Sequence, residues 1–153
     1  MLSAYAGRIR PIVLCVFSDG GRILVAEAHD SRKDQTFYRP IGGTIEFGER
    51  AADALRRELR EEINAEITGL RYLGTLENIF TYEGRSGHEI VLVYDARFVD
   101  GSLYEKEEMQ GWEVDIDRPF RIVWKHLDEF SPGNPPLYPE GLLDLLAKPQ
   151  KAK

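Results

Sequence analysis

The stretch GTIEFGERAADALRRELREEINA, residues 43–65, contains the one long, strongly helical segment in the first half of the chain. We predict a helix over Gly48–Ile63. At about 100° per residue, its apolar residues gather on one side, which is typical of a helix that packs on a sheet. These residues are Ala51, Ala52, Leu55, Leu59 and Ile63.

Three glutamates border that apolar stripe. With Glu58 placed at zero, Glu61 falls at about −60° and Glu62 at about +40°, so the three share one face. Like charges three or four residues apart cost a helix roughly 0.2–0.5 kcal/mol per pair. A solvated charged face would explain the cluster. A divalent cation would explain it better, because Mg²⁺ prefers oxygen ligands such as carboxylates.

The spacing around the cluster resembles the signature of the Nudix hydrolase family, the Nudix box. Gly43 is followed after five residues by Glu49, then after seven by Arg57-Glu58-Leu59, then after one by Glu61-Glu62. Six identities at about 6% background match by chance on the order of 10⁻⁷ per position. The preceding Tyr38–Gly43 is similar to the family's aromatic–Pro–Gly–Gly entrance, without its common Trp. The resemblance implies an α/β fold, an α/β/α sandwich with a mixed sheet between helices.

The chain departs from the usual box at its last two positions. Asn64 stands where the family has Gly, and Ala65 where it has a bulky aliphatic residue. Asn is the next-best residue after Gly for the left-handed position that ends a helix. Packing of Ile67 would offset the small Ala65. Neither departure changes a charged position, so we expect activity to be retained.

The resemblance assigns roles to the residues of the box. Glu58, Glu61 and Glu62, with the backbone of Gly43, would hold Mg²⁺, for which Mn²⁺ often substitutes. Arg57 would be an orienting catalytic residue that forms an ion pair with a glutamate such as Glu49. The implied reaction is hydrolysis of a phosphoanhydride in a nucleoside diphosphate linked to another group, such as a nucleotide sugar, ADP-ribose, a dinucleotide polyphosphate or an NTP.

Residues outside the box extend the candidate site. Arg39, Gly42, Gly43 and His88 are candidates for contacts with the substrate. A general base is sought among the glutamates of a charged segment, which would equally suit a plain surface loop. Aromatic residues would stack on a base or pack in the core. The base candidates are Glu105, Glu107, Glu108 and Glu113, and the aromatic ones are Phe37, Tyr38, Phe80, Tyr82 and Trp124.

Two other functions share the same residues. A catalytically silent, ligand-sensing Nudix domain would typically have lost box glutamates, which this chain keeps. An RNA cap hydrolase would need a basic path for RNA, whereas the net charge is −6. We therefore expect a small-molecule nucleotide substrate and no stable complex with nucleic acid. Many relatives form homodimers, and the sequence leaves the oligomeric state open.

Length and composition place the chain among soluble cytoplasmic proteins of one domain, residues 1–153. The single cysteine, Cys15, excludes an internal disulfide and is expected in a buried strand. The chain has no apolar run of about 18 residues, so we expect no membrane span. The tail from about residue 148 is expected to fray.

Strand and turn residues alternate over the rest of the chain. We predict a hairpin turn at Ser18–Gly21, and we expect Gly101–Arg118 to be an irregular, mobile loop. The remaining predicted strands are 9–17, 22–28, a short one from 37, 66–82, 89–99 and 120–124, with a polar loop at 29–36 and short helices at 127–130 and 139–147.

Overall fold

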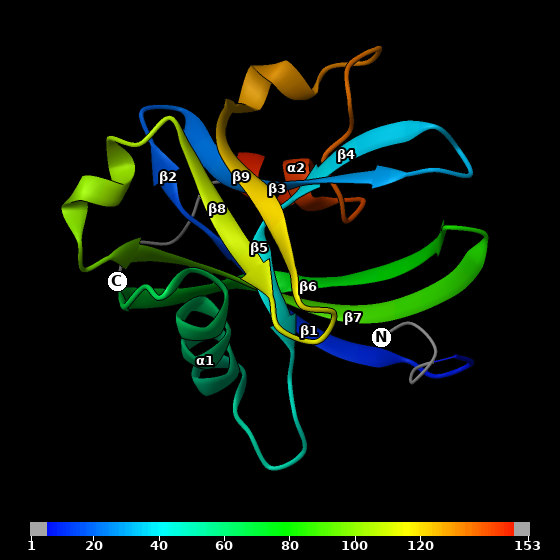
Figure 1. The fold of residues 1–153 in the computed structure, drawn as a ribbon, viewed down its shortest axis with the longest axis horizontal. Coiled ribbons are helices and arrows are strands. Elements are labelled where there is room, and N and C mark those ends of the chain that lie inside the picture. Colours follow the sequence, from blue (N-terminus) through cyan, green and yellow to red (C-terminus); the bar gives the residue numbers. More distant parts are fainter. Residues whose placement is uncertain (1–5, 149–153) are drawn as a thin grey trace.

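A computed structural model describes residues 6–148 of the chain (Figure 1). The predicted frayed tail lies outside the described residues from residue 149 onward. The strands are β1 Arg10–Val16, β2 Ser18–Asp19, β3 Arg22–Asp30, β4 Gln35–Arg39, β5 Ile41–Thr44, β6 Ile67–Tyr82, β7 Arg85–Phe98, β8 Glu108–Glu113 and β9 Arg118–His126. The helices are α1 Ala51–Ile63 and α2 Leu142–Ala147, with 3-10 turns at Gly101–Tyr104 and Leu127–Phe130.

The strands form two sheets. The four-stranded sheet has the order β5-β1-β7-β6, and only its β1–β7 pair is parallel. The second sheet has five strands in the order β2-β3-β9-β8, with β4 pairing on β3, and all its pairs are antiparallel. The predicted α/β class with a mixed sheet is confirmed, and the second, antiparallel sheet is an addition that the sequence pattern did not predict.

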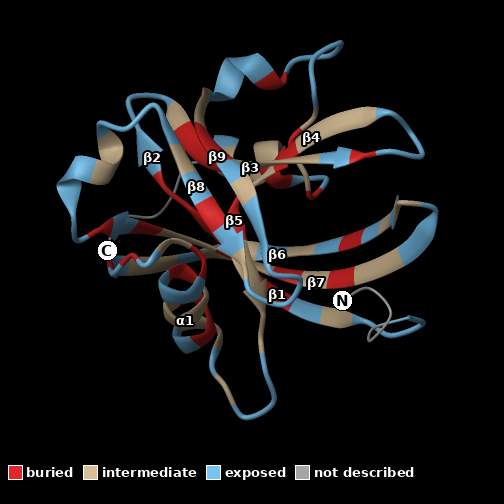
Figure 2. Cartoon of the chain, viewed as in Figure 1, coloured by how far each residue is buried: buried red, intermediate tan, exposed pale blue. Residues whose placement is uncertain are grey.

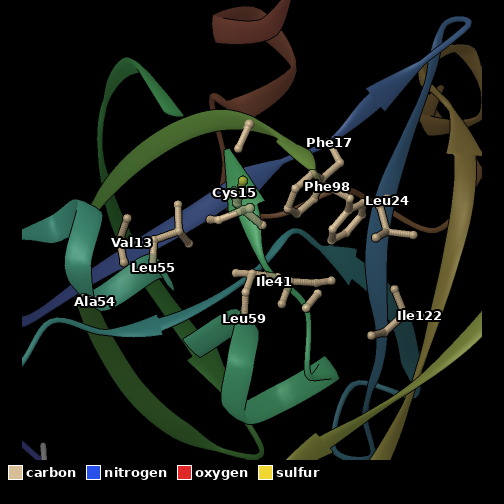
Figure 3. Close-up of a cluster of buried hydrophobic side chains, with 13 residues drawn as sticks. Val13, Cys15, Phe17, Leu24, Ile41, Ala54, Leu55, Leu59, Phe98 and Ile122 are labelled. Atoms are coloured by element: carbon tan, nitrogen blue, oxygen red, sulfur yellow. The ribbon is translucent and has the colours of Figure 1, made fainter. Parts of the chain in front are cut away.

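Strand β1 lies at the centre of the molecule and is buried on both faces (Figure 2). Val13 and Cys15 point to the face on which Leu55 and Leu59 of α1 pack (Figure 3). The alternate residues, such as Leu14, pack in a second cluster with α2 and the other sheet. Because both faces are covered, the strand reads as a continuous apolar run. The buried position predicted for Cys15 is confirmed, and burial raises the pKa of its thiol.

Helix α1 has the predicted apolar face, with one difference in the residues that form it. Leu55 and Leu59 are fully buried, and so is Ala54, which lay outside the predicted stripe. Glu62 is buried as well. The helix ends at Asn64, which has the left-handed backbone angles φ 51° and ψ 41° expected for that position. Ala51, Ala52 and Ile63 are half-buried.

Two predicted loops contain regular structure instead. The expected mobile loop Gly101–Arg118 includes the 3-10 turn and β8, which pairs with β9 from Glu108↔Val123 to Glu113↔Arg118. Likewise, the polar loop 29–36 is only a short turn between β3 and β4. In both places pairing with a neighbouring strand overrides weak local propensity. Within residues 6–148, no helix has the length and apolar character needed to cross a bilayer.

Candidate active site

A cavity of about 1020 Å³ lies between the two sheets and reaches the acidic face of α1, in the C-terminal half of the helix. Its walls include Gly43 and the three glutamates of the helix at one end. Strands β3, β4, β6 and β7 supply the other walls, and the β8–β9 turn at 114–116 borders it as well. The fold therefore brings the acidic helix to the edge of a cleft large enough for a nucleotide.

The tips of two hairpins meet on the side of the cavity away from α1 (Figure 1). Glu83, in the β6–β7 turn, accepts hydrogen bonds from the backbone N–H and the hydroxyl of Ser31, at 2.6 and 2.5 Å. Asp30 in turn accepts from the backbone N–H of Glu83 at 3.2 Å, and Lys33 donates to the carbonyl of Thr81 at 2.6 Å. These contacts join the two sheets where both hairpins border the cavity.

The three glutamates of α1 differ in their exposure. The Glu61 side chain is 41% exposed and that of Glu58 is 14% exposed. Glu62 as a residue is only 7% exposed. Along the predicted acidic face, exposure to solvent therefore decreases from Glu61 to Glu58 to Glu62.

Burial dominates the electrostatics of the inner pair. The carboxyl groups of Glu58 and Glu62 are hydrogen-bonded to each other. Burial, followed by the charges of Glu58 and Glu113, raises the pKa of Glu62 to about 10. Burial also raises the pKa of Glu58, against the opposing effect of Arg57. Burial and mutual repulsion thus favour a proton shared by this pair of carboxyl groups.

Arg57, midway along α1, contacts one glutamate that precedes the helix and two in its second half. Its Nε lies 2.9 Å from Oε2 of Glu49 and its second terminal nitrogen 3.0 Å from Oε1, so the ion pair predicted between these residues is present. The other terminal nitrogen donates to Glu58 at 3.0 Å and to Glu61 at 3.3 Å. A planar guanidinium provides such forked contacts, and a lysine does not.

The two glycines before the box lack side chains for different reasons. A Cβ at position 43 would lie 2.5 Å from both carboxylate oxygens of Glu58. A Cβ at position 42 would collide with the backbone carbonyl of Val13 on β1. Both glycines border the cavity. The missing side chain at Gly43 therefore allows the Glu58 carboxylate to lie against the backbone, whereas Gly42 permits close strand packing.

The donor set at this end of the cavity suits a hard divalent cation. Its side chains offer carboxylate oxygens, the ligands that Mg²⁺ prefers. The Glu58 carboxylate lies directly against Gly43, where a Cβ would collide with it. As the described side chains stand, no three acidic, histidine or cysteine groups converge into a closed metal cage. Glu58, Glu61 and Glu62 stay a predicted metal-binding set.

Among the four base candidates, the structure places only Glu113 on the cavity wall. Glu108 pairs with Arg121 at 3.0 Å instead, and Glu105 and Glu107 are exposed elsewhere. Burial, followed by the charge of Asp115, raises the pKa of Glu113. Its proximity to Glu62 comes from the β8–β9 pairing, which the sequence did not reveal.

The predicted substrate contacts divide between the two faces of the sheet. Arg39 lines the cavity, as expected, but His88 does not. Its neighbour Glu89 does, because successive residues of a strand point to opposite faces. The structure therefore places Glu89, and not His88, on the cavity wall.

Several cavity residues were not predicted from the sequence, among them Arg10, Thr44 and Asn78. Each lies on a strand beside apolar neighbours. Alternation along each strand could assign Arg10 to one face of β1 and Glu89 to one face of β7. Only the parallel register Arg10↔Glu89 shows that the two side chains lie on the same face of the sheet.

The aromatic candidates separate into cavity wall and core. Phe37, Phe80 and Tyr82 border the cavity. Phe37 packs against Tyr82 with ring centroids 5.8 Å apart, and against Tyr138 at 5.4 Å. The two remaining candidates, Tyr38 and Trp124, pack on Phe130 and Tyr104 instead.

Comparison with known proteins agrees with this geometry. Residues 8–140 match the family model described as the NUDIX domain. The chain is 27% identical over 127 residues to the NAD-capped RNA hydrolase NudC of Pseudomonas aeruginosa strain LESB58, covering 78% of this chain and 43% of that protein. A second relative, NudC of Pseudomonas putida strain W619, is 30% identical over 115 residues, with coverages of 75% and 37%. The chain thus spans about four-tenths of the length of these curated relatives.

A solved structure shares the fold. The MutT NUDIX hydrolase from Burkholderia pseudomallei superposes with a TM-score of 0.63 at 21% identity, over 91% of this chain and 97% of that one.

Proposed function

The chain belongs to the Nudix family, and we propose that it hydrolyses the pyrophosphate bond of a small nucleotide. The substrate class is a nucleoside diphosphate linked to another group: a nucleotide sugar, ADP-ribose, a dinucleotide polyphosphate or an NTP. One observation carries this proposal. The carboxylates of Glu58, Glu61 and Glu62 stand at one end of a cavity of about 1020 Å³ whose other walls carry arginines and aromatic rings.

The roles of the residues follow from their positions. Glu58, Glu61 and Glu62, beside the backbone of Gly43, would hold Mg²⁺, or Mn²⁺ in its place. The cation, when bound, stabilises negative charge on phosphoryl oxygens and lowers the pKa of water. Arg57 orients Glu58 and Glu61 through the contacts at 3.0 and 3.3 Å.

Two further residues complete the proposed chemistry. Glu113 borders the cavity, and burial raises its pKa, so it is the candidate general base. Arg39, which also borders the cavity, supplies positive charge for the substrate phosphates.

The test is a product-resolved hydrolysis screen with Mg²⁺ over these four substrate classes. We expect release of a nucleoside monophosphate or phosphate from at least one of them. A Glu61→Gln variant should lose most of the activity, whereas Glu66→Gln, which makes the same change at an exposed ion pair with Arg60, should not. No turnover of any substrate would overturn the function, and full activity of Glu61→Gln would overturn the metal assignment.

A second candidate comes from the names of the relatives. NAD joins two nucleosides through a pyrophosphate, so NAD-capped RNA carries the same type of bond. The net charge of −6 and a cavity lined by many carboxylates disfavour a path for an RNA chain. A comparison of NAD with NAD-capped RNA decides: preference for the capped RNA, with strong loss of activity in salt, would establish the cap hydrolase.

A silent ligand-sensing domain is the remaining alternative. It would bind a nucleotide in the presence of Mg²⁺ without converting it. The chain retains every charged position of the box, Glu49, Arg57, Glu58, Glu61 and Glu62, which favours catalysis over sensing.

A further inference from the structure

Two arginines on the cavity wall share one buried carboxylate. A terminal nitrogen of Arg10 lies 3.9 Å from Oε2 of Glu89, and one of Arg39 lies 3.6 Å from Oε1. The Glu89 side chain is only 4% exposed, and those of Arg10 and Arg39 are 15% and 30% exposed. Arg10 and Glu89 come from the mixed sheet and Arg39 from the antiparallel sheet, so the group spans the cleft between the sheets.

Neighbouring contacts hold this group in place and connect it to the acidic helix. Asn78 donates to Oε1 of Glu89 at 3.2 Å. Arg10 donates from Nε to the hydroxyl of Thr44 at 2.7 Å, and Arg57 of the box donates to the carbonyl of the same Thr44 at 3.0 Å. Thr44 therefore links Arg57 to Arg10.

The guanidinium groups of Arg10 and Arg39 share the carboxylate of Glu89. Both also lie within electrostatic range of Glu113, which borders the same cavity. A buried carboxylate without such partners would be costly, which explains why Glu89 needs the arginines. The distances of 3.6 and 3.9 Å exceed the roughly 2.7–2.9 Å of a charge-assisted hydrogen bond. Glu89 thus orients the guanidinium groups without taking up all five N–H donors of either.

We propose that Glu89 is a positioning residue that holds Arg10 and Arg39 as a two-arginine clamp for one phosphate of a bound pyrophosphate. The clamp grips the phosphate that faces away from the carboxylates of α1. The proposal rests on the proposed function, because that function supplies the pyrophosphate substrate. One phosphate would bind at the acidic residues of α1 through a cation, and the other would bind at the clamp.

The chemistry of both ends supports this division. Planar guanidinium groups match the geometry of phosphate oxygens with two parallel donors. The acidic end repels phosphate unless a cation is bound, whereas each guanidinium group of the clamp attracts it. A pyrophosphate that bridges the two ends would be oriented along the cavity, with one phosphorus presented at the helix.

The experiment uses methylenediphosphonate, a pyrophosphate analogue that cannot be hydrolysed and carries no base. Its binding to the full chain is measured by calorimetry with Mg²⁺ at constant salt. We expect Arg39→Ala to bind it roughly 10- to 100-fold more weakly, because each charge-assisted contact contributes about 1.5–3 kcal/mol. Arg39→Lys should recover only part of the loss, since lysine lacks the fork.

Two substitutions of Glu89 separate the effect of its charge from that of its length. Glu89→Gln keeps the shape of the side chain but removes its charge, whereas Glu89→Asp keeps the charge and shortens the side chain. If Glu89 acts by charge, Asp binds the analogue more tightly than Gln and, with a hydrolysed nucleotide, Gln raises KM about 10-fold with little change in kcat. Glu27→Gln is the control, because Glu27 borders the same cavity but pairs with Arg121 and Tyr38.

Each outcome decides the proposal. Binding of the analogue by Arg39→Ala as tight as that of the wild type overturns the clamp, and so does tighter binding by Glu89→Gln than by Glu89→Asp. If the Glu89 variants fail to fold, the two Arg39 variants decide alone. A wild type that hydrolyses no nucleotide but binds the analogue through Arg39 keeps the clamp and loses the proposed function. If the wild type hydrolyses a nucleotide while Arg39→Ala binds the analogue as tightly as the wild type, the proposed function stands and the clamp is overturned.

Discussion

Gly43 and Glu58 approach so closely that a Cβ at position 43 would lie 2.5 Å from both carboxylate oxygens of Glu58. We therefore expect Gly43→Ala to push the Glu58 carboxylate away from its place beside the cavity. Activity should fall by at least about 10-fold, and the Mg²⁺ concentration needed for half-maximal activity should rise. A steady-state titration with Mg²⁺ measures both effects.

Gly101→Ala is the matched control for this change. A Cβ at position 101 meets no atom within 4 Å, so this variant should behave as the wild type. Unchanged activity and Mg²⁺ dependence in Gly43→Ala would show that the close approach of Glu58 to Gly43 is not needed for activity.

The forked ion pair between Arg57 and Glu49 should stabilise the fold in a pH-dependent way. The hydrogen bonds from Arg57 lower the pKa of Glu49 in the folded protein. A carboxyl with a lowered folded pKa contributes stability above its unfolded pKa and loses it as pH falls through the folded value. Glu49→Gln should therefore cost about 1–2 kcal/mol at pH 7 and much less at pH 3. Urea unfolding at both pH values measures the difference, and an equal cost at both would contradict the ionic origin.

Glu62 predicts the opposite pH dependence for the metal-free protein. Burial and its acidic neighbours raise the pKa of Glu62 to about 10. Between the unfolded pKa and that value, the native state keeps a proton that the unfolded chain releases, so stability falls as pH rises. Glu62→Gln should flatten this fall, and its metal-free form should melt at a higher temperature than the wild type at pH 8.

Magnesium should change the wild type but not this variant. A cation that binds only the native state raises the melting temperature by mass action. We expect millimolar Mg²⁺ to raise the melting temperature of the wild type and to leave that of Glu62→Gln nearly unchanged. Parallel pH slopes and equal Mg²⁺ responses in the two proteins would remove Glu62 from the metal site.

The ring of Phe80 lies over Gly87 on the adjacent strand, where a Cβ would collide with it. Because Phe80 borders the cavity, this arrangement provides a flat apolar surface for a nucleobase. Gly87→Ala should displace the ring and raise KM for nucleotides several-fold, while the affinity for methylenediphosphonate stays unchanged. An equal effect on both ligands would mean that the substitution distorts the phosphate site as well.

The sequence alone determined the local features of the site. The period of α1, the acidic edge of that helix and the left-handed end at Asn64 all depend on residues within one short segment. The Arg57–Glu49 pair came from the resemblance of that segment to the Nudix box. Spacing along one helix places side chains without knowledge of the rest of the fold. The same holds for the buried strand around Cys15, whose continuous apolar run indicates burial on both faces.

Only the tertiary structure decided which distant residues share the cavity. The parallel register of β1 and β7 sets Arg10 beside Glu89, and the pairing of β8 with β9 brings Glu113 near Glu62. Alternation along a strand leaves two faces to choose from, and a register shift of one residue exchanges them. For this reason His88 was predicted where Glu89 lies. Pairing between strands far apart in the chain settles that choice, and it is not encoded in any single segment.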